Sequence, residues 1–259
     1  MYGVEAMYNI NQKEMRKLEQ IEEDQMRNVF QVKTGIQVPV HIMYLDLGQV
    51  PARYQVMRYK VNFLQYILQQ DENSLLYRML RAQQHNYVKG DWFSETITTL
   101  QELQISMSVE EIRNMTRKQF KKLSKLKSEE AAFNYLIEKQ EAGSKGRNIL
   151  YSKKLEMASY LYPNNYLSVE NQRQIFQIRS RSNPLPANRG ELQHCSTGCG
   201  KFLDNIHIFE CVVLNQTHES NIEQITNGTF EEMKSALNKW NNNLKKLQII
   251  DWMDSVISC

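Results

Sequence analysis

Apolar residues recur every three or four positions along most of the chain, which is the spacing of an amphipathic helix. The pattern is clearest in residues 52–69, where one face would consist of Met57, Val61, Leu64 and Leu68. Pro51 stands just before this segment, and a helix tolerates proline in its first turn. The sequence therefore predicts a helix over 52–69.

The same spacing predicts most of the other elements. Further helices are expected at 12–30, 71–84, 92–103, 150–161 and 168–178, with a closing helix containing Phe230, Met233, Leu237 and Trp240. The apolar stretch 40–47 favours a helix over a strand. Two capping boxes, Ser108 with Glu111 and Thr116 with Gln119, predict a short helix and a longer one behind them.

Composition supports a mainly α chain. Only 10 Gly and 5 Pro occur among 259 residues, too few for a turn-rich sandwich or barrel. Hydrophobic residues make up 41%, enough for a core, while 24% charged residues and a mean hydropathy of -0.58 indicate extensive polar helix surface. We expect a bundle-like helical region, then a small knuckle-like segment and a closing helix.

No apolar run approaches the roughly 20 residues that a membrane span needs, and no signal peptide is recognisable. We therefore expect an intracellular protein, nuclear or cytoplasmic, that is not secreted and has no membrane partner.

Positive charge is concentrated in one part of the chain. Between residues 115 and 154 there are eleven Lys or Arg and only four Glu. On the predicted helix after Thr116, one face carries Lys118, Lys121, Lys122 and Lys125, and the opposite face carries Phe120 and Leu123. Such a stripe can follow a phosphate backbone of RNA or DNA. It is equally compatible with the solvated side of an ordinary helix.

Residues 179–190 contain two prolines, a glycine and three arginines, so regular structure is not expected throughout. We interpret this segment as a linker. Its arginines, Arg179, Arg181 and Arg189, are further candidate contacts to nucleic acid.

The most specific chemical pattern is Cys195-x3-Cys199-x7-His207-x3-Cys211. Three thiolates and one imidazole form a common tetrahedral zinc shell, and four protein ligands leave no open position for a catalytic water. Gly198 and Gly200 supply the tight backbone that closely spaced ligands need. His194 is an alternative histidine ligand, and incidental free thiols are an alternative to a metal site.

Several segments, in order, resemble the carboxy-terminal region of non-LTR retrotransposon reverse transcriptases. They are Tyr2-Gly3-Val4-Glu5-Ala6, Lys17-Leu18-Glu19-Gln20-Ile21, Tyr44-Leu45-Asp46-Leu47-Gly48-Gln49-Val50-Pro51-Ala52-Arg53, Asn62-Phe63-Leu64-Gln65-Tyr66-Ile67-Leu68, Lys89-Gly90-Asp91-Trp92, and Cys195 through His207-Ile208-Phe209-Glu210-Cys211. Their shared order is more specific than any one segment. The spacing of the first two cysteines departs from the C-x2-C usual in that family.

The resemblance implies a series of parts. These are a thumb-like helical domain at 1–104, a basic helical connector at 105–178, a Pro/Arg linker at 179–194, a zinc-knuckle-like segment at 195–215 and a tail with a helix at 216–259. The implied partners are RNA or DNA and the catalytic part of a reverse transcriptase.

The polymerase chemistry of that family requires a palm with paired aspartates that hold two metal ions. This chain has no adjacent pair of aspartates, so we do not expect it to be an enzyme. A helical interaction protein without a metal or nucleic-acid role remains an alternative. A metal-dependent hydrolase or deaminase is disfavoured, since neither H-E-x-x-H nor H-x-E…C-x-x-C occurs.

Overall fold

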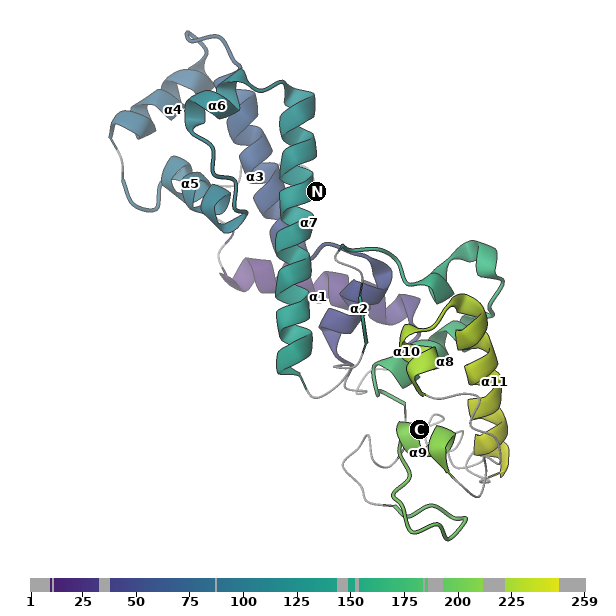
Figure 1. Ribbon diagram of the computed structural model, residues 1–259. Helices are drawn as coiled ribbons and strands as arrows, with labels where there is room; N and C mark the ends of the chain where they lie inside the picture. Colours follow the sequence, from purple (N-terminus) through teal and green to yellow (C-terminus); the bar gives the residue numbers. More distant parts are fainter. Residues whose placement is uncertain are drawn as a thin grey trace. The chain divides into compact units, whose positions relative to one another are not determined.

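The computed structural model describes residues 10, 12–32, 38–86, 88–143, 149–151, 154–183, 185, 193–211 and 222–246 (Figure 1). Within these ranges the chain is mainly helical and forms no β-strand; a single antiparallel bridge pairs His194 with Phe202. The predicted fold class is therefore confirmed. No helix in the described ranges is long and apolar enough to cross a membrane.

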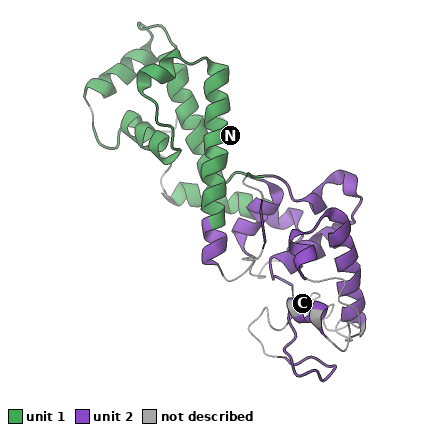
Figure 2. Ribbon diagram, viewed as in Figure 1, with its two compact units in different colours: residues 1–25, 49–137, 153–155 green, residues 26–48, 138–152, 156–259 purple. Residues whose placement is uncertain are grey.

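The chain divides into two compact units (Figure 2). Unit 1 comprises residues 1–25, 49–137 and 153–155, and unit 2 comprises residues 26–48, 138–152 and 156–259. Two long helices, α1 (Gln12–Val29) and α7 (Arg117–Ala142), contribute residues to both units. The five consecutive segments expected from sequence stay a prediction.

Unit 1 is built around an apolar core. Besides parts of α1 and α7, it contains α3 (Ala52–Leu68), α4 (Leu75–His85), α5 (Trp92–Glu102) and α6 (Val109–Asn114). Its buried side chains are Val61, Leu64, Ile67, Leu68, Leu80, Trp92, Phe93, Leu100, Leu103, Ile105, Ile112 and Phe120. Burying one such side chain contributes about 1.5–3 kcal/mol. The apolar face predicted for α3 accordingly lies in or against this core.

Side chains close the amino-terminal ends of several unit 1 helices. The predicted capping box at α6 is present, with Ser108 Oγ accepting from Glu111 N and Glu111 Oε2 accepting from Ser108 N. Thr116 and Gln119 make the corresponding contacts at α7. At α5, Asp91 Oδ1 accepts from Ser94 N at 2.7 Å. These contacts satisfy backbone N–H groups that the helix itself leaves unpaired.

Unit 2 contains the remaining described elements. They are α2 (Val40–Leu47), two 3₁₀ turns η2 (Ser159–Leu161) and η3 (Pro163–Asn165), α8 (Val169–Arg179), α9 (Asn205–Glu210), α10 (Ile222–Asn227) and α11 (Phe230–Lys246). The helix predicted at 150–161 is wrong, because residues 154–158 are not helical and only the turn η2 follows. The apolar spacing there reflects single anchors instead, such as the fully buried Tyr160.

A buried ion pair lies inside unit 2. Arg179, the last residue of α8, donates to Asp46 of α2, with Nη2 3.0 Å from Oδ1 and Nε 3.3 Å from Oδ2. Both side chains are almost inaccessible, at 4% and 0% exposed. Tyr151 and Tyr160 donate their hydroxyls to the same carboxylate at 2.8 and 2.6 Å.

The remaining donors of Arg179 point to the carbonyls of Ile225 and Thr226. Burial is the largest single influence and opposes the guanidinium charge, but the attractions of Asp46, Tyr151 and Tyr160 together outweigh it and raise the pKa of Arg179. For Tyr160, burial and then the negative charge of Asp46 raise the hydroxyl pKa well above its ordinary value. Every charge in the cluster is thus paired, as a low-dielectric interior requires.

Gly48 ends α2 in the left-handed region, with φ of 63°. A Cβ at this position would lie 2.6 Å from backbone atoms of Glu156 and Met157. Because neither backbone can move aside easily, only glycine fits here. This close approach lets Ala158 N donate to the carbonyl of Asp46 at 2.7 Å.

Candidate metal centre and basic surface

The four residues of the Cys/His pattern lie together in unit 2. The side-chain ligand atoms of Cys195, Cys199, His207 and Cys211 are all within 4.8 Å of one another. Cys199 Sγ lies 3.2 Å from His207 Nε2, and Cys211 Sγ lies 4.0 Å from the sulfurs of both Cys195 and Cys199. Two thiolates about 2.3 Å from one ion at tetrahedral angles lie about 3.8 Å apart, so the spacing suits one small ion.

A tight turn brings the first two cysteines together. Cys195 N donates to Lys201 O at 2.9 Å, and Leu203 N donates to Gln193 O at 2.8 Å. Gly198 and Gly200 both have positive φ, of 75° and 79°. The sequence-based role of these two glycines therefore agrees with the structure.

His207, and not His194, is the histidine of the cluster. The His194 ring instead packs on Phe202, with 4.6 Å between ring centroids. His207 lies in the first turn of α9, where Asp204 Oδ1 accepts from its backbone N at 2.6 Å. Cys211 follows at the carboxy-terminal end of α9, and its N donates to His207 O at 2.8 Å. A short capped helix therefore carries the second ligand pair.

Thr197 is a member of the site that the spacing of cysteines did not indicate. Its hydroxyl lies 3.1 Å from Cys195 Sγ and 3.5 Å from Cys211 Sγ. Hydroxyl groups beside metal-bound thiolates stabilise the negative sulfur and orient it. The one available signal was its position inside the Cys195–Cys199 loop.

The thiols differ in their surroundings. Burial raises the pKa of Cys195, whereas a hydrogen bond with the backbone of Lys201 lowers the pKa of Cys199. Cys195 and Cys211 are buried and Cys199 is partly exposed. A site with four protein ligands holds an ion firmly and leaves no coordination position for substrate, so the arrangement suits a structural role. Cys259 lies outside the described residues.

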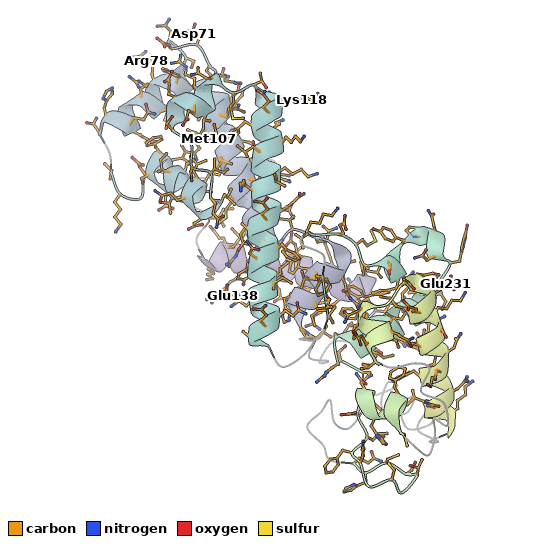
Figure 3. The ribbon with its side chains drawn as sticks, viewed as in Figure 1. Asp71, Arg78, Met107, Lys118, Glu138 and Glu231 are labelled. Carbon is orange, nitrogen blue, oxygen red and sulfur yellow. The ribbon has the colours of Figure 1, made fainter. Side chains whose placement is uncertain are left out.

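The lysine stripe is exposed on α7. Lys118, Lys121, Lys122 and Lys125 all have solvent-accessible side chains, while Phe120 is fully buried on the opposite face. Figure 3 shows Lys118 near the amino-terminal end of that helix. Lys125 lies 3.8 Å from Glu129, a weak surface contact. The predicted division of the helix into a packed and a basic face is confirmed.

The three arginines of the expected linker have different surroundings. Arg179 ends α8 and is buried against Asp46, which does not agree with its expected contact to nucleic acid, so we remove it from that surface. Arg181 is partly buried and lines a cavity. Arg189 lies outside the described residues.

Comparison with protein-family models, curated proteins and solved structures gives no match to this chain. Its class is therefore defined by the fold and the site alone: a mainly helical chain with a Cys₃His cluster that can hold a metal ion.

Proposed function

We propose that this chain is a zinc-containing, nucleic-acid-binding protein. More specifically, we propose that it is the carboxy-terminal thumb, connector and knuckle region of a non-LTR retrotransposon reverse transcriptase. In this role it grips template and primer, or element RNA, and performs no polymerisation. The observation that carries the proposal is the gathering of Cys195, Cys199, His207 and Cys211 around one point.

Zinc is the ion that best fits these ligands. Three sulfurs and one nitrogen are soft or borderline donors, which favour zinc over the hard cations calcium and magnesium. Two of the three thiols are buried, and a buried thiolate requires a compensating cation. A bound ion would supply that cation and would fix α9 to the preceding turn.

The four lysines on α7 support a polyanionic partner. They lie on one helix face, exposed and opposite the core, so their charges point the same way. Lysine contacts to phosphate give affinity without reading sequence. The net charge of +3 adds little to attraction at long range, so we assign the binding to this local surface.

The test begins with the purified chain and its metal content. We expect one zinc per chain by elemental analysis, with release on substitution Cys199→Ser. We also expect retarded migration of a structured RNA or a primer–template duplex at low salt. His194→Gln serves as the matched control, because the His194 ring packs on Phe202 and is not among the four clustered residues.

If the chain contains zinc but binds no nucleic acid, the proposed nucleic-acid function is wrong and the zinc site is only structural. If the chain binds nucleic acid but contains no zinc, the assignment of residues 195–211 as a zinc knuckle is wrong. Absence of both would favour a helical interaction protein without a metal or nucleic-acid role.

A second candidate function, a helical interaction protein, is favoured by one surface. Helix α4 exposes Leu75 and Met79, which are 72% and 55% accessible, and Val88 after the helix is 61% accessible. Leu75 and Met79 are four positions apart and share one helix face, and exposed apolar patches often mark protein contacts. Capture of a partner protein that is abolished by Met79→Ser, without nucleic-acid binding, would support this candidate.

A further inference from the structure

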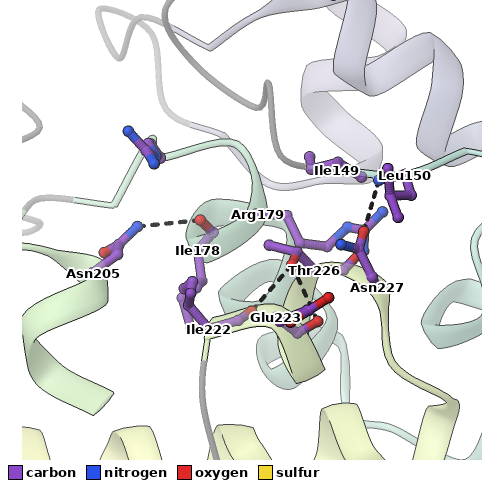
Figure 4. Close-up of a pocket in the computed structure, with 10 residues that line it drawn as sticks. Ile149, Leu150, Ile178, Arg179, Asn205, Ile222, Glu223, Thr226 and Asn227 are labelled. Atoms are coloured by element: carbon purple, nitrogen blue, oxygen red, sulfur yellow. Dashed lines mark hydrogen bonds between the residues drawn. The ribbon is translucent and has the colours of Figure 1, made fainter. Parts of the chain in front are cut away.

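A cavity in unit 2 has one wall on α9, the helix that carries His207, and none of the four clustered Cys and His residues lines it (Figure 4). Its volume is about 350 Å³, the lower end of the range for small-molecule sites. Residues from four segments line it, within 149–150, 178–181, 205 and 222–227. All of these residues belong to unit 2.

The interior of the cavity is apolar or already satisfied. Ile149 and Ile178 are buried, and Asn205 Nδ2 donates to Ile178 O at 3.1 Å. Thr226 Oγ1 donates back to the carbonyls of Ile222 and Glu223, both at 3.1 Å. A ligand that enters the cavity can therefore pack against apolar surface but finds few partners for hydrogen bonds. A flat, weakly polar ring fits such an interior better than an ion or a sugar.

The rim provides the charges. Arg181 is partly buried and Glu223 is exposed, and neither forms an ion pair within the described part of the chain. Arg179, by contrast, is already paired with Asp46, so its positive charge is compensated within the protein. One cation and one carboxylate at the mouth of an apolar cavity suit a ring with a hydrogen-bonding edge and an attached anion.

We propose that this cavity binds a single nucleotide of a nucleic-acid strand, with its base unstacked and inserted. The base packs against Ile149 and Ile178, Glu223 accepts from an amino group on the base edge, and Arg181 contacts the phosphate. Unstacked bases are the usual targets of selective RNA recognition, and a carboxylate selects edges that carry amino donors. This inference rests on the proposed nucleic-acid function and adds its selective contact.

The carboxylate predicts a preference among bases. Guanine, adenine and cytosine each carry an exocyclic amino group, whereas uracil has only an N3–H donor between two carbonyls that a carboxylate repels. Asn205 connects the cavity to the metal centre, because it opens the same helix, α9, that carries His207. A bound metal that fixes α9 therefore also fixes one wall of the cavity.

Mononucleotide binding tests the site directly. The zinc-loaded full chain is titrated with GMP, CMP and UMP, with inorganic phosphate as the probe for a phosphate-only site, and binding is followed by saturation-transfer NMR and calorimetry. We expect GMP and CMP to bind at least about tenfold more tightly than UMP and phosphate, a difference of one to two hydrogen bonds. Glu223→Gln and Arg181→Ala should each weaken GMP binding about tenfold or more.

The matched control is Glu231→Gln, which removes an exposed carboxylate at the start of α11 (Figure 3) without touching the cavity. Unchanged zinc content and melting temperature show that each variant is folded. Equal binding of all four probes, no binding, or GMP binding insensitive to both rim substitutions would overturn the cavity assignment. If the chain still retains RNA in a salt-sensitive way, the proposed function survives that result; loss of polymer binding in the unaltered chain overturns the function itself.

Discussion

Apolar side chains pack in the interiors of both units, but unit 2 also buries an ion pair and a cluster of thiols. Apolar packing is non-directional, so a single substitution lowers the free energy of unfolding only by the contributions of the lost apolar area and of the resulting cavity. A buried ion pair or a thiolate cluster is different, because removal of one partner leaves the other uncompensated. We therefore expect unit 2 to be the part of the protein that is most sensitive to single substitutions.

Metal removal should produce the largest difference in stability between the two units. Structural zinc sites contribute apparent free energies on the order of 10 kcal/mol to folding. Chelation, or Cys199→Ser, is expected to increase amide hydrogen exchange in residues 193–211 and to leave α3 and α5 protected. Mass spectrometry of the exchanged peptides measures both regions in one sample. Equal protection with and without chelator would contradict a metal-stabilised unit 2.

Breaking the buried ion pair should come next. Arg179→Met leaves Asp46 buried without its cation and with only the two tyrosine hydroxyls as side-chain donors, which we expect to cost about 3–5 kcal/mol in urea unfolding. The matched control is Arg53→Met, since Arg53 forms a partly exposed pair with Glu19 at 2.8 Å in unit 1. That change should cost no more than about 1 kcal/mol. Similar losses for both variants would show that burial of the unit 2 pair is energetically unimportant.

High pH should also destabilise unit 2. Burial, followed by the charge of Asp46, raises the pKa of Tyr151 and Tyr160 in the folded protein. The folded state therefore keeps protons that the unfolded state loses above pH of about 10. The stabilisation is complete below that pH and falls by up to about 1.4 kcal/mol per pH unit and tyrosine above it.

Tyr160→Phe isolates this contribution. Urea unfolding between pH 9 and 11 should show a less steep loss of stability for this variant than for the unaltered chain. Parallel curves for the two proteins would contradict the assignment of the alkaline loss to Tyr160.

A change at the surface of unit 1 should have the smallest effect. Ser108→Ala removes the hydroxyl that caps α6, a contact exposed to solvent. We expect a loss of about 1 kcal/mol, measured as a small fall in melting temperature. A loss as large as that of Arg179→Met would remove the contrast between the two units.

The same contrast explains how far the sequence could predict the structure. In unit 1, helix periodicity and capping boxes depend on residues three or four positions apart, so α3, α6 and α7 could be predicted closely. In unit 2, Asp46 and Arg179 are 133 positions apart, and nothing local indicates that they pair. The aspartate inside the apolar stretch of α2 is a local sign that a buried partner is needed, but it does not identify that partner.

The metal centre lies between these cases. Its four ligands fall within seventeen positions, from Cys195 to Cys211, and the sequence grouped them correctly. The choice between His194 and His207 depended on the bridge that turns His194 toward Phe202. Thr197 could be assigned a role only once its hydroxyl was placed between two sulfurs. The four ligands could be identified from neighbouring positions in the sequence, whereas the contacts of Thr197 and His194 could be assigned only from the fold.

The salt dependence of nucleic-acid binding tests the central claim most directly. For the zinc-loaded chain on a duplex, the logarithm of the binding constant should fall linearly with the logarithm of salt concentration. Replacing the stripe lysines Lys118, Lys121, Lys122 and Lys125 by Gln should reduce the slope by up to about 3.6, roughly 0.9 for each phosphate that is no longer neutralised. The matched control replaces four exposed lysines elsewhere, Lys13, Lys17, Lys234 and Lys245. We predict a shallower slope for the stripe variant alone; equal slopes for both variants, or no binding by the unaltered chain, would contradict the account.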